Sequence, residues 1–451
     1  MVPGFQQGQQ VGFLALEPLA CHRRTILYSI LDGVSRLQVR PSGPLSGSVQ
    51  IQGAKNSALK LMAACVLAEG RYVLRNVPRI SDVDHMCELL TAMGMSTRWR
   101  EDSALEIIRG DEVIPEAPYE LVERMRASSA VIGPLLGSVG RASVAMPGGD
   151  DFGSRPIDMH LQGLEAIGAE FTMEHGIIRG TATELVGTEI VLDYPSVGAT
   201  ENLLMAAVRA KGVTVVHNAA REPEIADLAA FLNRMGARVI GAGGPVLTIE
   251  GVDELRAVEH NVIPDRIEVA TFLCALGVAG GEIHLRGARL DHIDLLVEKL
   301  GMMGLRVSPE PGGIWAMAGE RPKPVDIATL PYPGLATDYL PMLVALLCFA
   351  DGTSYATENV FAGRFRYIGE LTRMGARVRI EDHHMVIDGV ERLSSAPVKA
   401  LDIRAGAAMV IAALGADGET IISDADHVDR GYENFEERLR SIGVDIVELD
   451  D

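Results

Sequence analysis

The chain has 451 residues, of which 47% are hydrophobic and 23% are charged, and its formal net charge at pH 7 is −20. A chain of this length is too long for one ordinary hydrophobic core and predicts two sizeable domains. The acidic balance argues against nucleic acid and anionic membranes as partners, because no broad basic surface is expected. An anionic small molecule would therefore need a local cluster of arginine and lysine.

The N-terminal residues 1–36 differ in character from the rest of the chain. The apolar stretch VGFLALEPLAC is short, contains Glu17 and Pro18, and follows no basic region, so neither a signal peptide nor a membrane span is expected. We interpret these residues as an extension on a cytoplasmic protein. The five cysteines show no metal or redox spacing, and the sequence contains no HExxH motif, so no metal site is expected.

A helix-like stretch that ends in glycine and leads into a short strand pattern occurs six times, at intervals of 68 to 74 residues. Internal repetition of this kind indicates a fold built from copies of one unit. Glycine directly after a helix and before a strand is the usual signal for a helix end. The six glycines are Gly94, Gly168, Gly236, Gly304, Gly375 and Gly443.

Each repeat also contains an alanine-rich helix that is apolar on nearly all sides, such as GAAMVIAALGADG at residues 406–418. Helices of this composition belong inside a structure, covered by sheet. Each unit is therefore predicted as strand–helix–strand–helix–strand–strand, which makes the protein α/β. Six units most simply form two threefold domains. We expect one domain at residues 55–263 and the other at 37–54 with 264–451.

Polar residues gather at the expected start of each apolar helix. Asn, Ser and Asp are ordinary caps there, but a lysine or arginine opposes the helix macrodipole and costs a few tenths to about 1 kcal/mol. Several such cations predict a bound anion, since helix N-termini already offer free N–H groups. Alternatively, the cations pair with nearby carboxylates such as Glu123, Asp265, Glu268 or Asp402. The residues concerned are Lys55, Asn56, Arg126, residues 196–201, Asp265, Arg266, Asp338 and Arg404.

Two carboxylates attract attention within this pattern. Asp338, in GLATDYLP, is either a helix cap or, opposite a cationic site, a general base toward a substrate hydroxyl. In the loop MPGGDDFGSRP, residues 146–156, Asp150 lies five residues before Arg155. The composition of this loop is that of an ordinary turn. A turn does not require the arginine, however, which leaves open whether the loop takes part in chemistry.

Ten short motifs provide the most specific signal: GAKNSA, MRAS, PGGDDFGSRPIDMH, SVGATEN, REPEI, PDRIE, TDYLPM, GRF, DIRAGA and DRGYE. In this order they resemble the enolpyruvyl transferases, and the resemblance extends from about residue 37 to residue 449. It implies two inside-out α/β barrels, each of three βαβαββ units, in agreement with the repeats. It also implies transfer of the enolpyruvyl group of phosphoenolpyruvate to the 3′-hydroxyl of UDP-N-acetylglucosamine, with release of phosphate, in the first committed step of peptidoglycan synthesis. No metal or organic cofactor is implied.

The resemblance also implies roles for individual residues. Phosphoenolpyruvate would be held by Lys55, Arg155 and Arg404, with Arg126 and Arg364 nearby. The sugar would meet Asn56 and Asp338, and Asp338 would be the base acting on its 3′-hydroxyl. Positions expected to bind the nucleotide are Pro156, Asp158, His160, Ser196, Gly198 and Val360, and further polar positions of the cleft are Asp82 and Glu222.

The loop at residues 146–156 matches the family's lid, which carries the proton donor for C3 of phosphoenolpyruvate. The family most often has a cysteine at this position, whereas this chain has Asp150. Because fosfomycin alkylates that cysteine, the resemblance implies fosfomycin resistance here. Departures at Glu123, Ala130 and Leu335 leave the acceptor open. The alternatives are a sister transferase acting on a uridine nucleotide such as UMP in nucleoside-antibiotic biosynthesis, or a non-catalytic regulator that binds UDP-sugars.

Overall fold

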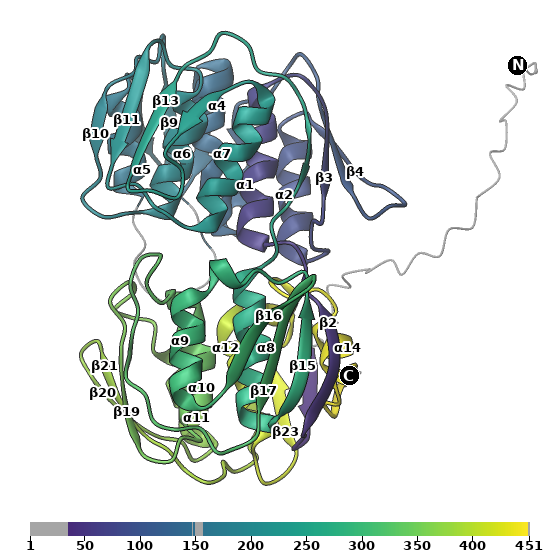
Figure 1. Ribbon diagram of the computed structural model, residues 1–451. Helices are drawn as coiled ribbons and strands as arrows, with labels where there is room; N and C mark the ends of the chain where they lie inside the picture. Colours follow the sequence, from purple (N-terminus) through teal and green to yellow (C-terminus); the bar gives the residue numbers. More distant parts are fainter. Residues whose placement is uncertain (1–34, 147, 149–156, 450–451) are drawn as a thin grey trace, which may run out of the picture. The chain divides into compact units, whose positions relative to one another are not determined.

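The computed structural model describes residues 35–146, 148 and 157–449, and Val34–Asp451 forms one compact unit. Residues 1–34 of the predicted extension, and Asp150, Arg155 and Pro156 of the predicted lid, lie outside the described residues. Within the described chain, strands and helices alternate in repeating units (Figure 1). No helix in this part of the chain is both long enough and apolar enough to cross a membrane.

The strands of the described chain form six sheets of four strands each. In every sheet the first two strands pair in parallel and the next two continue it by antiparallel pairing. The first three sheets, given in spatial order, are β14 (Glu259–Asn261), β3 (Gly70–Arg75), β5 (Leu105–Arg109), β4 (Ser96–Trp99); β6 (Glu116–Ala117), β7 (Arg141–Ala145), β9 (Ile177–Thr181), β8 (Glu170–Glu174); and β10 (Glu189–Val191), β11 (Val213–His217), β13 (Val246–Glu250), β12 (Arg238–Ile240).

The other three sheets repeat this pattern but recruit two strands from the N-terminal part of the chain. The first of these strands completes the last repeat, whose own segment supplies only three strands. These sheets are β2 (Leu45–Gln50), β15 (Gly281–Arg286), β17 (Gly313–Ala318), β16 (Arg306–Glu310); β18 (Ile327–Ala328), β19 (Thr353–Thr357), β21 (His384–Asp388), β20 (Arg377–Glu381); and β22 (Val398–Lys399), β23 (Thr420–Ser423), β1 (Arg36–Val39), β24 (Ile446–Leu449).

Two strands are exchanged between repeats, so the chain passes twice between the two sets of sheets. Strand β2 pairs with β15, although the repeat that follows it along the chain contains β3, and β14 pairs with β3 instead. The two passing segments pair with each other at Gly53 and Pro264. A Cβ atom at Gly53 would lie 1.6 Å from the backbone oxygen of Asn76, so only glycine fits at this crossing.

Six apolar helical segments are buried, as the sequence predicts. In α12 all twelve residues are buried, and in α8 only two of fourteen are not. Side chains of this kind stabilise a core by about 1.5–3 kcal/mol each when fully buried. The buried segments are α1 (Lys55–Ala64), the 3-10 helix η2 (Arg126–Val131) continuing into α4 (Ile132–Val139), α6 (Val197–Ala207), α8 (Arg266–Ala279), α10 (Leu340–Leu347) preceded by the 3-10 helix η4 (Thr337–Tyr339), and α12 (Ile403–Leu414).

These helices divide between two hydrophobic cores. Helices α1, α4 and α6 belong to one core, and α8, α10 and α12 belong to the other (Figure 1). Each core is thus a group of three buried helices with three sheets around it, which confirms the predicted α/β fold. The bounds 55–263 and 37–54 with 264–451 for two separate domains stay a proposal.

The remaining helices alternate with the buried ones along the chain and are charged on one face. Each carries exposed positions as well as buried ones, as the sequence predicts for the second helix of each repeat. They are α2 (Ser81–Ala92), α3 (Tyr119–Val122), α5 (Asp158–Ala166), α7 (Pro223–Met235), α9 (Asp294–Met303), α11 (Arg366–Arg373), α13 (Asp426–Asp429) and α14 (Phe435–Arg440), together with the 3-10 helix η3 (Leu290–His292). The 3-10 helix η1 (Cys65–Leu67) directly follows α1 and is buried like it.

The repeat glycines end these helices in the predicted way. All six have a positive φ, between 86° and 112°, where an L side chain is strained. The backbone requirement of the helix-to-strand turn therefore accounts for the six-fold recurrence of glycine at this position.

Helix α9 offers a matched test, because Gly301 lies inside the helix and Gly304 ends it at φ 110°. A Cβ would meet open space at both positions. We expect Gly304→Ala to lower the free energy of unfolding by about 1–2 kcal/mol through backbone strain, and Gly301→Ala to raise it by about 0.5–1 kcal/mol. Urea denaturation of both variants measures this. Equal effects of the two substitutions would contradict the turn requirement.

Candidate functional site

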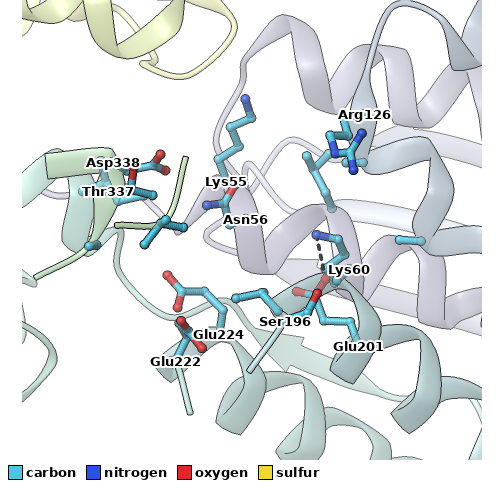
Figure 2. Close-up of a pocket in the computed structure, with 18 of the residues that line it drawn as sticks. Lys55, Asn56, Lys60, Arg126, Ser196, Glu201, Glu222, Glu224, Thr337 and Asp338 are labelled. Carbon is cyan, nitrogen blue, oxygen red and sulfur yellow. Dashed lines mark ion pairs between the residues drawn. The ribbon is translucent and has the colours of Figure 1, made fainter. Parts of the chain in front are cut away.

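A cavity of about 500 Å³ lies where the N-terminal ends of the buried helices converge. Its wall includes the start of α1, η2, α6, α8, η4 and α12. Figure 2 shows labelled residues from α1, η2, α6 and η4 around this space. Most of the sequence-predicted site residues meet here. Those that line the cavity are Lys55, Asn56, Asp82, Arg126, His160, Ser196, Gly198, Glu222, Asp338, Val360, Arg364 and Arg404.

Four predicted residues are not placed in this wall. Asp158 is the exposed first residue of α5 and does not line the cavity, although its neighbour in the helix, Met159, does. Asp150, Arg155 and Pro156 lie outside the described residues. Their roles therefore rest on the sequence alone.

The cavity concentrates positive charge in an acidic protein. Its described wall contains seven lysine and arginine side chains and five carboxylates, whereas the whole chain carries a formal net charge of −20. Such a local excess favours anionic ligands. The cations are Lys55, Lys60, Arg126, Arg266, Arg364, Arg404 and Arg430, and the carboxylates are Asp82, Glu201, Glu222, Glu224 and Asp338.

Lys55 is held by a buried carboxylate on α2. Its Nζ lies 2.6 Å from Asp82 Oδ2, and Arg430 donates from Nε to Asp82 Oδ1 at 3.0 Å. Burial lowers the pKa of Lys55, an effect that the charge of Asp82 opposes. Burial would raise the pKa of Asp82, but the two cations hold it below its usual value. Asp82 is therefore ionised and fixes two cations at the cavity wall.

Asp338 lies between two buried guanidinium groups. Arg364 Nη1 donates to Asp338 Oδ1 at 2.8 Å, and Arg404 Nη2 lies 3.6 Å from Asp338 Oδ2. Burial would raise the pKa of Asp338, but Arg364 and then Arg404 hold it far below its usual value. The guanidinium of Arg404 also stacks over the ring of Tyr432, 5.3 Å from its centroid. Asp338 is thus an ionised carboxylate with a quarter of its side chain exposed to the cavity.

The carboxylates named as alternative partners of these cations have other tasks. Asp265 caps α8 by accepting from Ile267 N at 2.7 Å, and Asp402 caps α12 by accepting from Arg404 N at 2.8 Å. Arg266 pairs instead with Glu224, at 2.9 Å from Nε to Oε1. Lys55, Arg266 and Arg364 are therefore paired with carboxylates more than 20 positions away in the sequence, and not with the neighbours that the alternative interpretation named.

The start of α6 forms a second part of the cavity. Ser196 caps this helix by accepting from Ala199 N at 3.3 Å. His160 packs so closely against the helix that a Cβ at Gly198 would lie 2.6 Å from its Cε1 atom. Asn202 Nδ2 donates to His160 Nδ1 at 3.0 Å, which leaves the proton of the neutral ring on Nε2. Burial, followed by the charges of Arg126 and Lys60, lowers the pKa of His160 to about 4.

Sequence analysis misses several charged residues of this wall. Arg430 is part of the DRGYE motif, so this motif could have identified it as a site residue. Lys60 lies five residues after Lys55 in α1, about 140° further around the helix, so helical spacing gives no signal that both lysines face one cavity. Glu224, in REPEI, carries no such signal, because its partner Arg266 lies 42 residues away.

Comparisons with known proteins agree with this site. The family model described as EPSP synthase (3-phosphoshikimate 1-carboxyvinyltransferase) matches residues 21–439. UDP-N-acetylglucosamine 1-carboxyvinyltransferase 1 of Caldanaerobacter subterraneus subsp. tengcongensis is 47% identical over 91% of this chain and 99% of its own length. UDP-N-acetylglucosamine 1-carboxyvinyltransferase of Mycobacterium tuberculosis is 49% identical over 91% of this chain and 98% of its own.

Solved structures of the same architecture are also similar. The crystal structure of the enolpyruvyl transferase NikO from Streptomyces tendae has a TM-score of 0.83 at 25% identity, covering 93% of this chain and all of its own. An EPSP synthase structure from Acinetobacter baumannii has a TM-score of 0.72 at 18% identity, covering 92% of this chain and all of its own. The second likeness shows the fold alone.

The buried His160 makes stability depend on pH. Its folded pKa is about 4 and its usual value is 6.5, so the unfolded chain takes up this proton first as the pH falls. Stability is therefore lost between pH 6.5 and 4, by about 2 kcal/mol at pH 5. We expect His160→Gln to remove about this much of the loss of unfolding free energy measured by urea denaturation between pH 7 and 5. His384→Gln, on an exposed strand, is the control and should change nothing.

Proposed function

This chain belongs to the EPSP synthase family of enolpyruvyl transferases, and we propose that it transfers the enolpyruvyl group of phosphoenolpyruvate to the 3′-hydroxyl of UDP-N-acetylglucosamine. The relatives named for this reaction are nearly half identical over nine-tenths of the chain, which supports the acceptor. The observation that carries the proposal is the cavity in which Asp338 lies among buried cations. Such a reaction would serve peptidoglycan synthesis in the cytoplasm.

The cations of the cavity suit the phosphate and carboxylate of phosphoenolpyruvate. On this proposal Lys55 and Arg404 bind these anions, with Arg155 from the lid and Arg126 and Arg364 nearby. Asp82 holds Lys55 in place before any ligand arrives, and Tyr432 does so for Arg404. Cations positioned in advance by buried partners lose little conformational freedom when the anion binds. Preorganisation of this kind is the usual source of electrostatic catalysis.

Asp338 is suited to accept the proton of the acceptor's 3′-hydroxyl, while Asn56 binds the sugar. In the empty cavity Arg364 and Arg404 hold the pKa of Asp338 far too low for an effective base. When the anions of phosphoenolpyruvate share these guanidinium groups, the positive field at Asp338 falls and its pKa rises. The base is thus ionised before substrate binding and becomes more basic once both substrates are present.

The reaction then proceeds by addition and elimination. The 3′-oxygen bonds to C2 of phosphoenolpyruvate and its proton passes to Asp338, while C3 receives a proton from Asp150. Loss of a C3 proton and departure of phosphate from C2 then restore the double bond as an enol ether. Asp150 can donate only if its pKa is raised, by lid closure or by the substrate anions. No metal or organic cofactor takes part.

The start of α6 is suited to the nucleotide. Its free N–H groups near Ser196 and Gly198 favour the diphosphate, and the neutral His160 offers one donor from Nε2. The cavity wall continues through Val360. Pro156 and Asp158 stay nucleotide-binding positions on the resemblance alone. Glu222 precedes α7 and lines the same cavity, where burial raises its pKa.

Three acceptors separate this proposal from its alternatives. Phosphate release from phosphoenolpyruvate is measured with UDP-N-acetylglucosamine, UMP and shikimate 3-phosphate. UMP is included because a sister transferase acting on a uridine nucleotide is the first alternative. Turnover with UMP alone would favour a sister transferase. Tight binding of UDP-N-acetylglucosamine without turnover of any acceptor would favour a non-catalytic regulator.

Removing the proposed base tests the chemistry. We expect Asp338→Asn to lower kcat for phosphate release by about 10²–10⁴-fold, since the amide still accepts from Arg364 but cannot take a proton. Its dissociation constant for UDP-N-acetylglucosamine should stay within about threefold in a titration without phosphoenolpyruvate. Asp388→Asn, on strand β21 outside the cavity, is the control. A kcat near that of the wild type would exclude Asp338 as the base.

Fosfomycin tests the assignment of Asp150. We expect the wild-type enzyme to keep its activity after incubation with fosfomycin, because a carboxylate is a far weaker nucleophile toward it than a thiolate. Asp150→Cys should be inactivated in a time-dependent manner that dilution does not reverse. Asp151→Cys places a thiol one residue away and should resist. Rapid covalent inactivation of the wild type would show that Asp150 is wrongly assigned.

A further inference from the structure

A further buried ion pair lies in the cavity wall and has no part in the chemistry above. Lys60 on α1 and Glu201 on α6 face each other, with 2.9 Å between Nζ and Oε2 (Figure 2). The side chain of Glu201 is 1% exposed and that of Lys60 is 15% exposed. Both residues line the cavity, so the partial exposure of Lys60 is toward the ligand space.

This pair is poorly explained as a stabilising element. Burial raises the pKa of Glu201 to about 7 despite Lys60, and the nearby Glu224 and Glu222 raise it further. Neither oxygen of Glu201 accepts a hydrogen bond from the residues that the structure describes, so its 2.9 Å contact with Lys60 is an ion pair without hydrogen-bond geometry. Two well-packed apolar side chains would often be as stable as a buried pair of this kind. A ligand that binds the charge of Lys60 would explain why this ion pair is present in the cavity wall.

The surroundings of Lys60 indicate which ligand group this is. Lys60 pairs with Glu201, five residues after Ser196, the cap of α6, and Arg126 lines the same cavity. The charges of both cations lower the pKa of His160, which packs against Gly198 at the start of this helix. The capping residue Ser196 and the close contact between Gly198 and His160 form the same corner of the cavity. A lysine ammonium has three N–H donors, and Glu201 does not use all of them. Two cations beside a helix N-terminus are suited to a phosphate-bearing group.

We propose that Lys60 binds the diphosphate of the nucleotide sugar, and that Glu201 is a positioning residue which holds the Lys60 ammonium beside the start of α6. This inference rests on the proposed function, because it assigns part of the same cavity to the acceptor. On this proposal Lys60 contacts the diphosphate and neither the uridine nor the sugar.

Titration of truncated ligands tests this directly. Lys60→Met should weaken binding of UDP and UDP-N-acetylglucosamine by about 10- to 100-fold, the range for loss of a charge-assisted hydrogen bond. Uridine should bind as it does to the wild type, and the KM for phosphoenolpyruvate should change little. Lys60→Arg should recover most of the UDP affinity. Lys211→Met, which breaks an exposed pair with Glu184, is the matched control.

A double variant removes the main competing explanation. Lys60→Met alone leaves the Glu201 carboxylate without its cation, and that charge could itself repel a diphosphate. In Lys60→Met with Glu201→Gln the charge is gone, so we expect UDP binding to remain at least tenfold weaker than in Glu201→Gln alone. Recovery of the double variant to the level of Glu201→Gln would overturn the proposal. Equal weakening of uridine and UDP by Lys60→Met would also overturn it, in favour of a purely structural pair.

The binding measurements need no turnover, so the two proposals fail separately. If the wild type releases no phosphate with UDP-N-acetylglucosamine but its UDP affinity depends on Lys60, the proposed reaction is wrong and the diphosphate contact stands. If turnover is normal and Lys60→Met binds UDP as the wild type does, the reaction stands and the diphosphate contact is wrong.

Discussion

The arrangement of this protein is set by the energetic cost of placing lysine and arginine at the N-terminal ends of buried helices. A helix covered on all sides by sheet needs an end where its free N–H groups can meet polar partners. In this fold the ends converge on one cavity, and they carry lysine and arginine where the helix dipole disfavours them. Buried carboxylates such as Asp82 and Asp338 make this arrangement stable in the empty protein. The same ion pairs place the cations where an anionic ligand needs them.

The exchange of strands β2 and β14 explains how one cavity draws on both sets of sheets. The two passing segments pair at Gly53 and Pro264, and α1 and α8 each begin two residues later. The pairing therefore brings the starts of these two helices together. Lys55 N even donates to Asp265, the cap of α8, at 3.2 Å. Ion pairs such as Asp82 with Arg430 then join residues 348 positions apart. The topology of the sheets is therefore what brings the site residues together.

The sequence predicts what is local and repeated. Six glycines with positive φ, and helices that are apolar on every side, follow from backbone sterics and periodicity, and these features were predicted correctly. The presence of cations at the helix starts could also be predicted, because that prediction requires only the position where each helix begins. The ion-pair partners of these cations could not be predicted from the sequence. Pairing of Arg266 with Glu224 or of Lys60 with Glu201 depends on tertiary packing. The alternative interpretation named nearby carboxylates as partners, and two of these, Asp265 and Asp402, are helix caps.

The pairing of most of these cations with carboxylates also bears on ligand selection. A cation whose charge is already compensated gains little from one small anion, because the anion must also face the carboxylate partner. A ligand that reaches several pairs collects a small gain from each, while the cations lose little freedom because they are already held. The proposed substrates carry a carboxylate, a phosphate and a diphosphate, which would meet Lys55, Arg404 and Lys60 at separate points. A cavity of compensated cations therefore favours that combination over an isolated phosphate ion, even though every group it recognises is a simple anion.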